Sequence, residues 1–167
     1  MNIFMLHENP DENVKLHCDK HVVKMILEYA QMLSTAHRVL DGDEKQPELL
    51  YKATHKNHPC TKWASANCAN YMYLYYLFAK LCEEYTHRYG KIHLTEKKLS
   101  TILATPPENI SHARNVSLID MPQCMPDEYK GINVVGAYRK YYRGEKLQIA
   151  KYTKRDTPQW MTGNENG

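Results

Sequence analysis

The 167-residue sequence has no long hydrophobic run. No apolar stretch approaches the roughly 20 residues that a membrane-spanning helix needs, so we expect no membrane partner. The segment 1–10 is too short and too polar for a signal peptide. Cysteine is scarce: the five cysteines are an odd number and lack the spacing of a secreted disulfide scaffold. These absences predict reduced thiols and a cytoplasmic protein, located in the host-cell cytoplasm if a phage encodes it.

Signals for β-strands are nearly absent as well, so the sequence predicts an all-α fold. Asn9 and Pro10 form a helix start, with a capping side chain followed by a proline at the first helical position. We predict one long helix over residues 10–40 and a second over residues 61–89. Gly90 is suited to end the second helix, because glycine readily adopts the left-handed conformation of a helix C-cap.

The remainder of the chain predicts two further helices. A shorter third helix is expected over Thr95–Leu103, and a basic C-terminal helix over about Asn133–Tyr152. The length of the chain suits one hydrophobic core. We therefore predict a single all-α domain over residues 1–160 and a flexible polar tail over residues 161–167.

Two short clusters concentrate the side chains that carry chemistry. Residues 17–21 read His-Cys-Asp-Lys-His, and residues 55–60 read His-Lys-Asn-His-Pro-Cys. Together they contain four of the nine histidines and two of the five cysteines. Histidine and cysteine gather where protons move, metals bind or charged ligands are held. The clusters therefore predict a functional site without naming its reaction.

A metal site is one interpretation of these clusters. His17 and His21 are four residues apart, so on one helix both rings would emerge from the same face. With His58 and Cys60 they would form a zinc-like ligand set. The chain has no Cys-x-x-Cys pair, and histidines also serve in hydrogen bonding or phosphate contact. We therefore expect no cofactor and keep these four residues as the alternative metal site.

The first predicted helix carries two candidate catalytic acids, Asp19 and Glu28. Either carboxylate can act as a general acid or base if it lies in a cleft beside the histidines. Each also has a nearby lysine, Lys20 or Lys24, with which it can form an ordinary surface ion pair. Cys18 and Cys60 lie close to histidines in the sequence and leave a cysteine nucleophile as a further possibility.

The positive charge of the chain is concentrated near its end. Residues 130–160 contain eight Lys or Arg against two acids and carry a net charge of +6, whereas the rest of the chain carries −3. Aromatic residues run through this segment, which predicts phosphate contact and base stacking. A solvated helix whose tyrosines pack on the core is the alternative. The candidate nucleic-acid contacts here are Arg139, Lys140, Tyr142, Arg143, Lys154 and Arg155.

Three segments of the chain resemble those of a group of small phage proteins. They are His-Cys-Asp-Lys-His-Val-Val-Lys-Met at residues 17–25, Asn-His-Pro-Cys at 57–60, and the run from Ala137 to Lys146. A more distant resemblance is to the phage pyrimidine-dimer DNA glycosylases. These are single all-α domains of similar size with an N-terminal arm, a histidine before a long second helix and a basic, aromatic C-terminal part.

The second resemblance implies a mechanism. In that family the terminal α-amine attacks the sugar of the damaged nucleotide, expels the base and forms a Schiff base, after which β-elimination nicks the strand. Asn2 is larger than the residues that permit removal of the initiator methionine, so the amine would be that of Met1. The helix acid would be Asp19, with Glu28 in reserve. The phosphate contacts would be His17, Lys20, His21, Lys24 and His58.

We therefore predict a DNA glycosylase with abasic-site lyase activity on damaged or modified pyrimidines, acting as a monomer on double-stranded DNA. The alternatives are a metal-dependent hydrolase of nucleotides or nucleic acid, and a non-enzymatic phage accessory protein that binds nucleic acid or a host factor. The candidate catalytic residues are Met1, Asp19, His21, Glu28 and His58.

Overall fold

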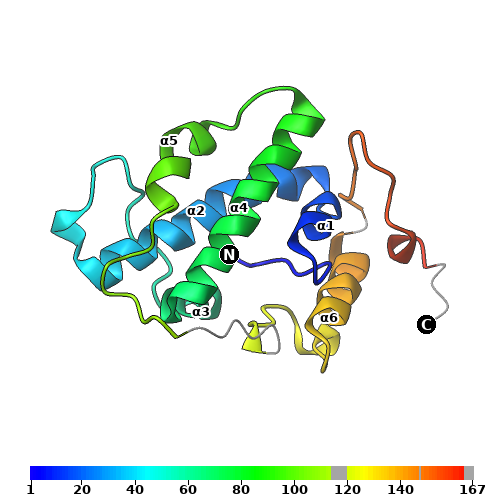
Figure 1. The fold of residues 1–167 in the computed structure, drawn as a ribbon. Helices are drawn as coiled ribbons and strands as arrows, with labels where there is room; N and C mark the ends of the chain where they lie inside the picture. Colours follow the sequence, from blue (N-terminus) through cyan, green and yellow to red (C-terminus); the bar gives the residue numbers. More distant parts are fainter. Residues whose placement is uncertain (114–119, 147, 164–167) are drawn as a thin grey trace.

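The computed structural model describes residues 1–113, 120–146 and 148–163, and the prediction of an all-α fold is confirmed. Helices α2 and α4 cross at the centre of the molecule, and α6 lies on the other side of the N-terminal segment (Figure 1). None of the described helices is long and apolar enough to cross a bilayer. The α-helices are α1 (Pro10–Lys15), α2 (Asp19–Asp41), α3 (Pro59–Ala66), α4 (Cys68–Tyr89), α5 (Leu94–Leu103) and α6 (Val134–Tyr141).

The predicted helix over residues 10–40 is two helices, and its single span was wrong. It begins as expected, with the Asn9 side chain accepting a hydrogen bond from the Asp11 amide. The chain then leaves the helix at Leu16–Cys18 because the ring of His17 turns into the core. Its Nδ1 atom forms a hydrogen bond with the Asn13 carbonyl at 2.9 Å. In a continuous helix this carbonyl would accept from the backbone amide of His17 instead. Helix α2 therefore restarts at Asp19 in a new direction.

The predicted helix over residues 61–89 is also interrupted, at Asn67. This residue is fully extended, with φ −159° and ψ 164°, and its side chain accepts a hydrogen bond from the Asn70 amide. It therefore ends α3 and caps α4. At the other end of α4, Gly90 adopts the left-handed conformation with φ 67°, as its position predicted. Helix α5 starts within one residue of the predicted Thr95.

The basic C-terminal helix is much shorter than predicted. Helix α6 ends at Tyr141, and a π-helical turn follows over Tyr142–Lys146. This turn widens the helix and brings the Tyr142 ring fully into the core. A Cβ atom added at Gly144 would come within 2.5 Å of the Tyr129 hydroxyl oxygen, so these two residues are in close contact. From residue 148 to Pro158 the described chain has no helix, and a short 3₁₀ turn follows over Gln159–Met161.

The N-terminal arm, residues 1–6, is part of the core. Its residues from Ile3 to Leu6 are at most 4 % exposed, and burial of each such side chain contributes about 1.5–3 kcal/mol. Asn13 fixes the arm by accepting from the Leu6 amide and donating to the Phe4 carbonyl. The arm thus lies between the helices that follow it and the C-terminal part of the chain (Figure 1).

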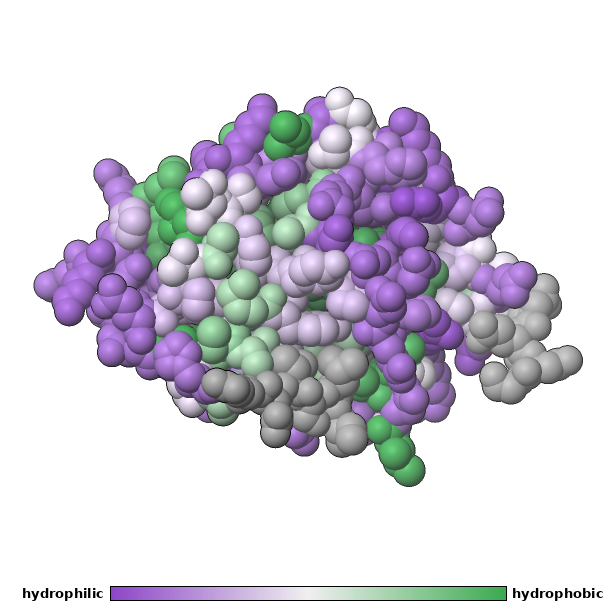
Figure 2. All heavy atoms as spheres, viewed as in Figure 1, coloured by the Kyte–Doolittle hydropathy of each residue, from purple (hydrophilic) through white to green (hydrophobic). Residues whose placement is uncertain are grey.

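The surface is mainly hydrophilic over the end where α1 meets the C-terminal segment, and on this face its apolar areas are small and scattered (Figure 2). In the predicted polar tail, Met161 is only 1 % exposed and packs into the core. Residues 164–167 of that tail lie outside the described part of the chain.

Candidate active site

A polar pocket of about 240 Å³ opens beside the start of the chain. Three parts of the fold form it: the N-terminal arm, one face of α2, and the C-terminal part with the Cys124 segment and the π-helical turn. It is lined by Met1, Asn2, Phe4, His21, Lys24, Met25, Glu28, Cys124, Tyr141 and Lys146. Residues from both ends of the sequence therefore meet at one site.

The terminal amine and a carboxylate face each other in this pocket. The α-amino nitrogen of Met1 lies 3.9 Å from Oε2 of Glu28, whose side chain is 13 % exposed. The other oxygen, Oε1, lies 3.5 Å from Nζ of Lys24, one helical turn earlier. This arrangement pairs a potential nucleophile with a potential proton acceptor, the two groups that amine-based covalent catalysis requires.

Asn2 holds the terminal residue in place. Its side-chain amide donates to the Cys124 carbonyl at 2.8 Å, and its side-chain oxygen accepts from the Tyr138 hydroxyl at 2.6 Å and from the Ile3 amide. Both the nitrogen and the oxygen of the Asn2 side-chain amide are therefore hydrogen-bonded, and the residue is only 8 % exposed. These bonds also restrict the position of the Met1 amine.

His21 lines the pocket with a neutral ring. Burial lowers its pKa to about 3, and the charges of His17, Lys146 and Lys24 add to the effect. The ring stacks on Phe4 with 4.4 Å between centroids, and its Nδ1 atom is hydrogen-bonded to the Tyr142 hydroxyl. When that hydroxyl donates, the proton of the imidazole is on Nε2. His21 is thereby suited to donate a hydrogen bond while remaining uncharged.

His17 does not reach the surface, and its assignment as a phosphate contact was wrong. The ring is fully buried between the Asn13 carbonyl and the Tyr29 hydroxyl. Burial lowers the pKa of His17 to about 4, so the ring is neutral at physiological pH. The break between α1 and α2 also separates His17 from the helix that carries His21, so the predicted shared helix face does not exist.

Asp19 lies in a different network from Glu28. Its carboxylate accepts hydrogen bonds from the Arg88 guanidinium at 3.0 Å and from the amide and hydroxyl of Thr153 at 2.8 and 2.6 Å. Nine helical residues separate Asp19 from Glu28, or about 13 Å along the axis. The structure therefore brings Glu28, and not Asp19, to the terminal amine.

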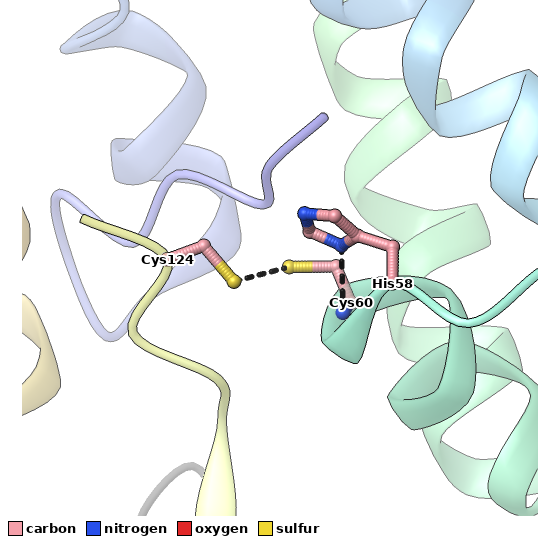
Figure 3. A group of neighbouring side chains, drawn as sticks. All are labelled: His58, Cys60 and Cys124. Carbon is pink, nitrogen blue, oxygen red and sulfur yellow. Dashed lines mark hydrogen bonds between the residues drawn. The ribbon is translucent and has the colours of Figure 1, made fainter. Parts of the chain in front are cut away.

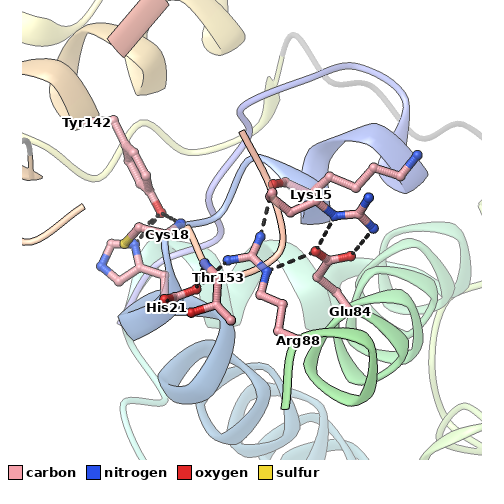
Figure 4. A network of polar contacts seen from close by, with 9 residues as sticks. Lys15, Cys18, His21, Glu84, Arg88, Tyr142 and Thr153 are labelled. Atoms are coloured by element: carbon pink, nitrogen blue, oxygen red, sulfur yellow. Dashed lines mark hydrogen bonds and ion pairs between the residues drawn. The ribbon is translucent and has the colours of Figure 1, made fainter. Parts of the chain in front are cut away.

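Arg88 is the centre of this second network (Figure 4). Its side chain is completely buried and also bonds the Glu84 carboxylate and the Lys15 carbonyl, at 2.9 and 3.0 Å. Glu84, 4 % exposed, accepts a further bidentate pair of hydrogen bonds from Arg155. The network joins α1, α2, α4 and the C-terminal segment, and every charge in it is paired.

The predicted nucleic-acid contacts fall into two groups. Tyr142 is fully buried and cannot stack on a base, so that assignment was wrong. Arg155 is held by Glu84, and Arg139 donates to the Leu6 carbonyl while covering the Trp160 ring. Lys140 and Lys154 also donate to backbone carbonyls, those of Glu128 and His87. Among the predicted contacts, the exposed cations with no hydrogen bond to a described residue are Lys20, Lys24 and Arg143, and Lys24 forms an ion pair with Glu28.

A cysteine and histidine cluster adjoins the pocket. The ligand atoms of His58, Cys60 and Cys124 all lie within 4.8 Å of one another, and the two sulfur atoms are 3.5 Å apart (Figure 3). The hydrogen bond from the Cys60 thiol lowers the pKa of Cys124 to about 7 and raises that of Cys60. His17 and His21 are not part of this cluster, so the four-residue metal set predicted from the sequence was wrong.

The comparison with known proteins bears on the arm and the first helices. The sequence profile of the family described as pyrimidine dimer DNA glycosylase matches residues 1–97, more than half of the chain. The chain belongs to this family. The predicted resemblance is thereby confirmed, and membership implies a DNA glycosylase that binds DNA. No curated protein and no solved structure gives a significant match.

The part that matches the pyrimidine dimer DNA glycosylase family contains most of the site. Met1, His21 and Glu28 lie inside the matched range, as do His58 and Cys60. The rest of the pocket lining comes from outside it, and consists of Cys124, Tyr141 and Lys146.

Sequence reasoning missed several residues of the site in this glycosylase family member. Cys124 has no motif around it, and Lys146 lies in a recognised segment that gives no sign of the pocket, because the role of both residues depends on tertiary contacts. Arg88 closes a helix rich in tyrosine and shows no signal except its position four residues after Glu84. That spacing is also typical of ordinary surface ion pairs.

Proposed function

We propose that this protein excises damaged pyrimidines from duplex DNA and cleaves the resulting abasic site, with the Met1 α-amine as nucleophile and Glu28 as the acid. The observation that carries the proposal is the 3.9 Å approach of this amine to Glu28 inside a polar pocket. Family membership supplies the DNA glycosylase activity, and the pair supplies the chemistry.

The reaction begins with the neutral amine. The nucleophile is the unprotonated form of the amine, and Glu28 beside it is placed to accept its proton. The nitrogen lone pair of the amine forms a bond to the C1′ carbon of the nucleotide as the glycosidic bond breaks, and the base leaves with the electrons of the glycosidic bond and then takes up a proton. The attacking nitrogen loses a proton to Glu28. Its lone pair then forms the C1′=N bond of the Schiff base as the C1′–O4′ bond breaks, and O4′ takes up the proton from Glu28. Removal of a C2′ proton then expels the 3′ phosphate and nicks the strand.

Two histidines support this pathway. Neutral His21 presents a ring N–H in the pocket, which is suited to hydrogen-bond the sugar or the base without placing a positive charge beside the developing sugar cation. His58 is partly exposed and its pKa is lowered by burial and by the charge of the Met1 amine. It contributes a neutral donor or acceptor near the same amine.

The pocket is bordered by groups that suit a nucleic-acid strand. Lys24 and Lys146 line it, and Lys20 lies one turn from Lys24 on the same exposed face of α2. Tyr141 offers an aromatic surface beside them, and Lys146 lies over its ring at 5.2 Å. These side chains are the proposed contacts for the phosphates and for a nucleotide turned out of the duplex.

The test uses a duplex containing a single abasic site, incubated with the protein in the presence and absence of borohydride. We expect a nicked strand without reductant and a covalent adduct with it, and peptide mapping should place the adduct on the Met1 nitrogen. A Lys24→Arg variant is the matched control, because it keeps the charge beside Glu28 and should still be trapped. An adduct that disappears in this variant would move the nucleophile to Lys24, and absence of any adduct would contradict the lyase proposal.

A further inference from the structure

The two cysteines in the cluster of His58, Cys60 and Cys124 have no part in the chemistry proposed above, and its histidine has only a supporting one. It joins the N-terminus of α3 to the segment around Cys124, two parts of the chain that are 64 residues apart. We propose that this cluster binds a Zn²⁺ ion that fixes the arm and the Cys124 segment around the pocket. The inference does not depend on the glycosylase mechanism.

The spacing of the ligand atoms suits a tetrahedral zinc ion. With Zn–S bonds of about 2.3 Å and a Zn–N bond of about 2.0 Å, tetrahedral geometry separates the ligand atoms by about 3.5–3.8 Å. The sulfurs of Cys60 and Cys124 are already 3.5 Å apart, and no pair in the cluster exceeds 4.8 Å. A shift of about 1 Å in the histidine ring would complete three of the four positions.

Backbone amides lie near both sulfurs. The Ile3 amide lies near the thiol of Cys60 and the Cys60 amide near that of Cys124, and each acts to lower the pKa of the thiol beside it. Such N–H donors stabilise the negative charge of a zinc thiolate. When the metal binds, the two thiols release their protons to solvent, so a divalent ion with two thiolates and a neutral imidazole leaves no net charge in the cluster.

His58 has the freedom that ligation requires. In this structure its Nδ1 atom accepts a hydrogen bond from the Cys60 amide at 3.1 Å. Ligation through Nε2 would place the imidazole proton on Nδ1 and end that bond. The Cys60 amide lies near the Cys124 thiol, so this sulfur is the acceptor that remains for it.

The position of the cluster gives the ion a structural consequence. Cys60 contacts the arm at Ile3, and the carbonyl of Cys124 accepts from the side chain of Asn2. Both cysteines therefore border the residues that hold Met1 in place. A metal linking them would tie the arm, α3 and the Cys124 segment into one unit, and its fourth position is available to water or a neighbouring side chain.

The test measures metal binding by the protein and does not depend on catalytic activity. Protein purified in the presence of Zn²⁺ should retain a single ion per chain, and Co²⁺ exchanged into the site should give the intense visible bands and thiolate charge-transfer band of tetrahedral cobalt. Cys124→Ser should lose both, whereas Cys68→Ser, which removes a partly exposed thiol outside the cluster, should keep both. Circular dichroism of Cys124→Ser confirms that the variant is folded, and this half-buried position tolerates the change better than buried Cys60.

Two results would overturn the proposal. One is a wild-type protein that neither retains zinc nor gives the cobalt spectrum after reduction. The other is a Cys60–Cys124 disulfide in the protein as isolated, seen as three alkylated cysteines in place of five after denaturation. Borohydride trapping is scored separately, so loss of zinc binding with intact trapping would refute only the metal site, and the reverse would refute only the lyase.

Discussion

Helix α2 carries two carboxylates in opposite situations. Asp19, at its first turn, receives three hydrogen bonds from Arg88 and Thr153, which leave its oxygens fully engaged. Glu28, in the middle of the helix, contacts two amines at 3.5 and 3.9 Å and lies at the wall of a pocket. A carboxylate that already accepts hydrogen bonds from neighbouring side chains stabilises the fold. A carboxylate that can still accept a hydrogen bond or a proton at the wall of a pocket can act on a ligand.

The same contrast separates the two regions around these acids. In the network of Arg88, Glu84 and Asp19, the first two side chains are almost completely buried and Asp19 is 20 % exposed. All three charges are paired, and the network links four segments of the chain. The pocket around Met1 and Glu28 is polar, open and flanked by exposed lysines. The first region should therefore govern stability, and the second activity.

The largest expected effect is on turnover. Glu28→Gln keeps the shape of the side chain but removes the proton acceptor, so we expect strand nicking to fall by about 10²–10⁴-fold with little change in melting temperature. Asp19→Asn is the matched comparison on the same helix and should retain most of the activity while lowering the melting temperature. Equal nicking by wild type and Glu28→Gln, with a large loss in Asp19→Asn, would reverse the assignment of the two acids.

The next effect is on the free energy of unfolding. Arg88→Met removes the central cation, leaves Asp19 without a cation and leaves Glu84 paired with Arg155 alone, so we expect a loss of about 3 kcal/mol in a urea titration. Lys80→Met removes a cation from surface ion pairs with Glu83 and Asp11 and should cost much less. If both variants were equally stable, the buried network would have no special role.

Acid should affect the two regions in different pH ranges. In the folded state burial lowers the pKa of His17 to about 4 and of His21 to about 3, whereas the unfolded chain protonates both near pH 6.5. Between these values the unfolded state binds protons that the native state does not, so stability should fall as the pH drops from about 6.5 to about 4. Melting temperatures measured across this range, in wild type and in Asp19→Asn, should show the same decline.

A second decline should follow at lower pH. Partial burial opposes ionisation of Asp19, but the hydrogen bonds from Thr153 and Arg88 outweigh it and lower its pKa; the arginines do the same for Glu84. Their contribution is complete above the unfolded pKa of about 4 and is lost as the pH falls through the lower folded values. Asp19→Asn should weaken this decline selectively, and an unchanged curve below pH 4 would argue against the network.

The smallest expected effect is on binding to DNA. Lys146→Ala removes one proposed phosphate contact at the pocket, so the slope of log affinity against log salt should decrease by about 1. Lys140→Ala is the comparison, because its ammonium group donates to the Glu128 carbonyl on another part of the surface. Fluorescence anisotropy with a labelled duplex at several salt concentrations measures both slopes, and equal slopes in the two variants would remove Lys146 from the interface.

The sequence predicts the helical class and most helix ends, because caps such as Asn9 and Gly90 act through local chemistry. It does not reveal the break at His17, because that break depends on a side chain that displaces a backbone hydrogen bond and on the Tyr29 hydroxyl 12 residues away. The pairing of Met1 with Glu28 is likewise a tertiary event. Only the path of the arm through the core decides which of the two acids meets the amine.

The burial of the arm has a consequence for synthesis of the protein. Asn2 is bonded to Cys124 and Tyr138, 122 and 136 residues further along the chain. The first residues leave the ribosome early but cannot reach their final position until this distant segment has also emerged. Contacts of such long sequence separation form late, after the local helices. A nascent chain would thus expose its first residues without the site around them until residues 124–138 have emerged.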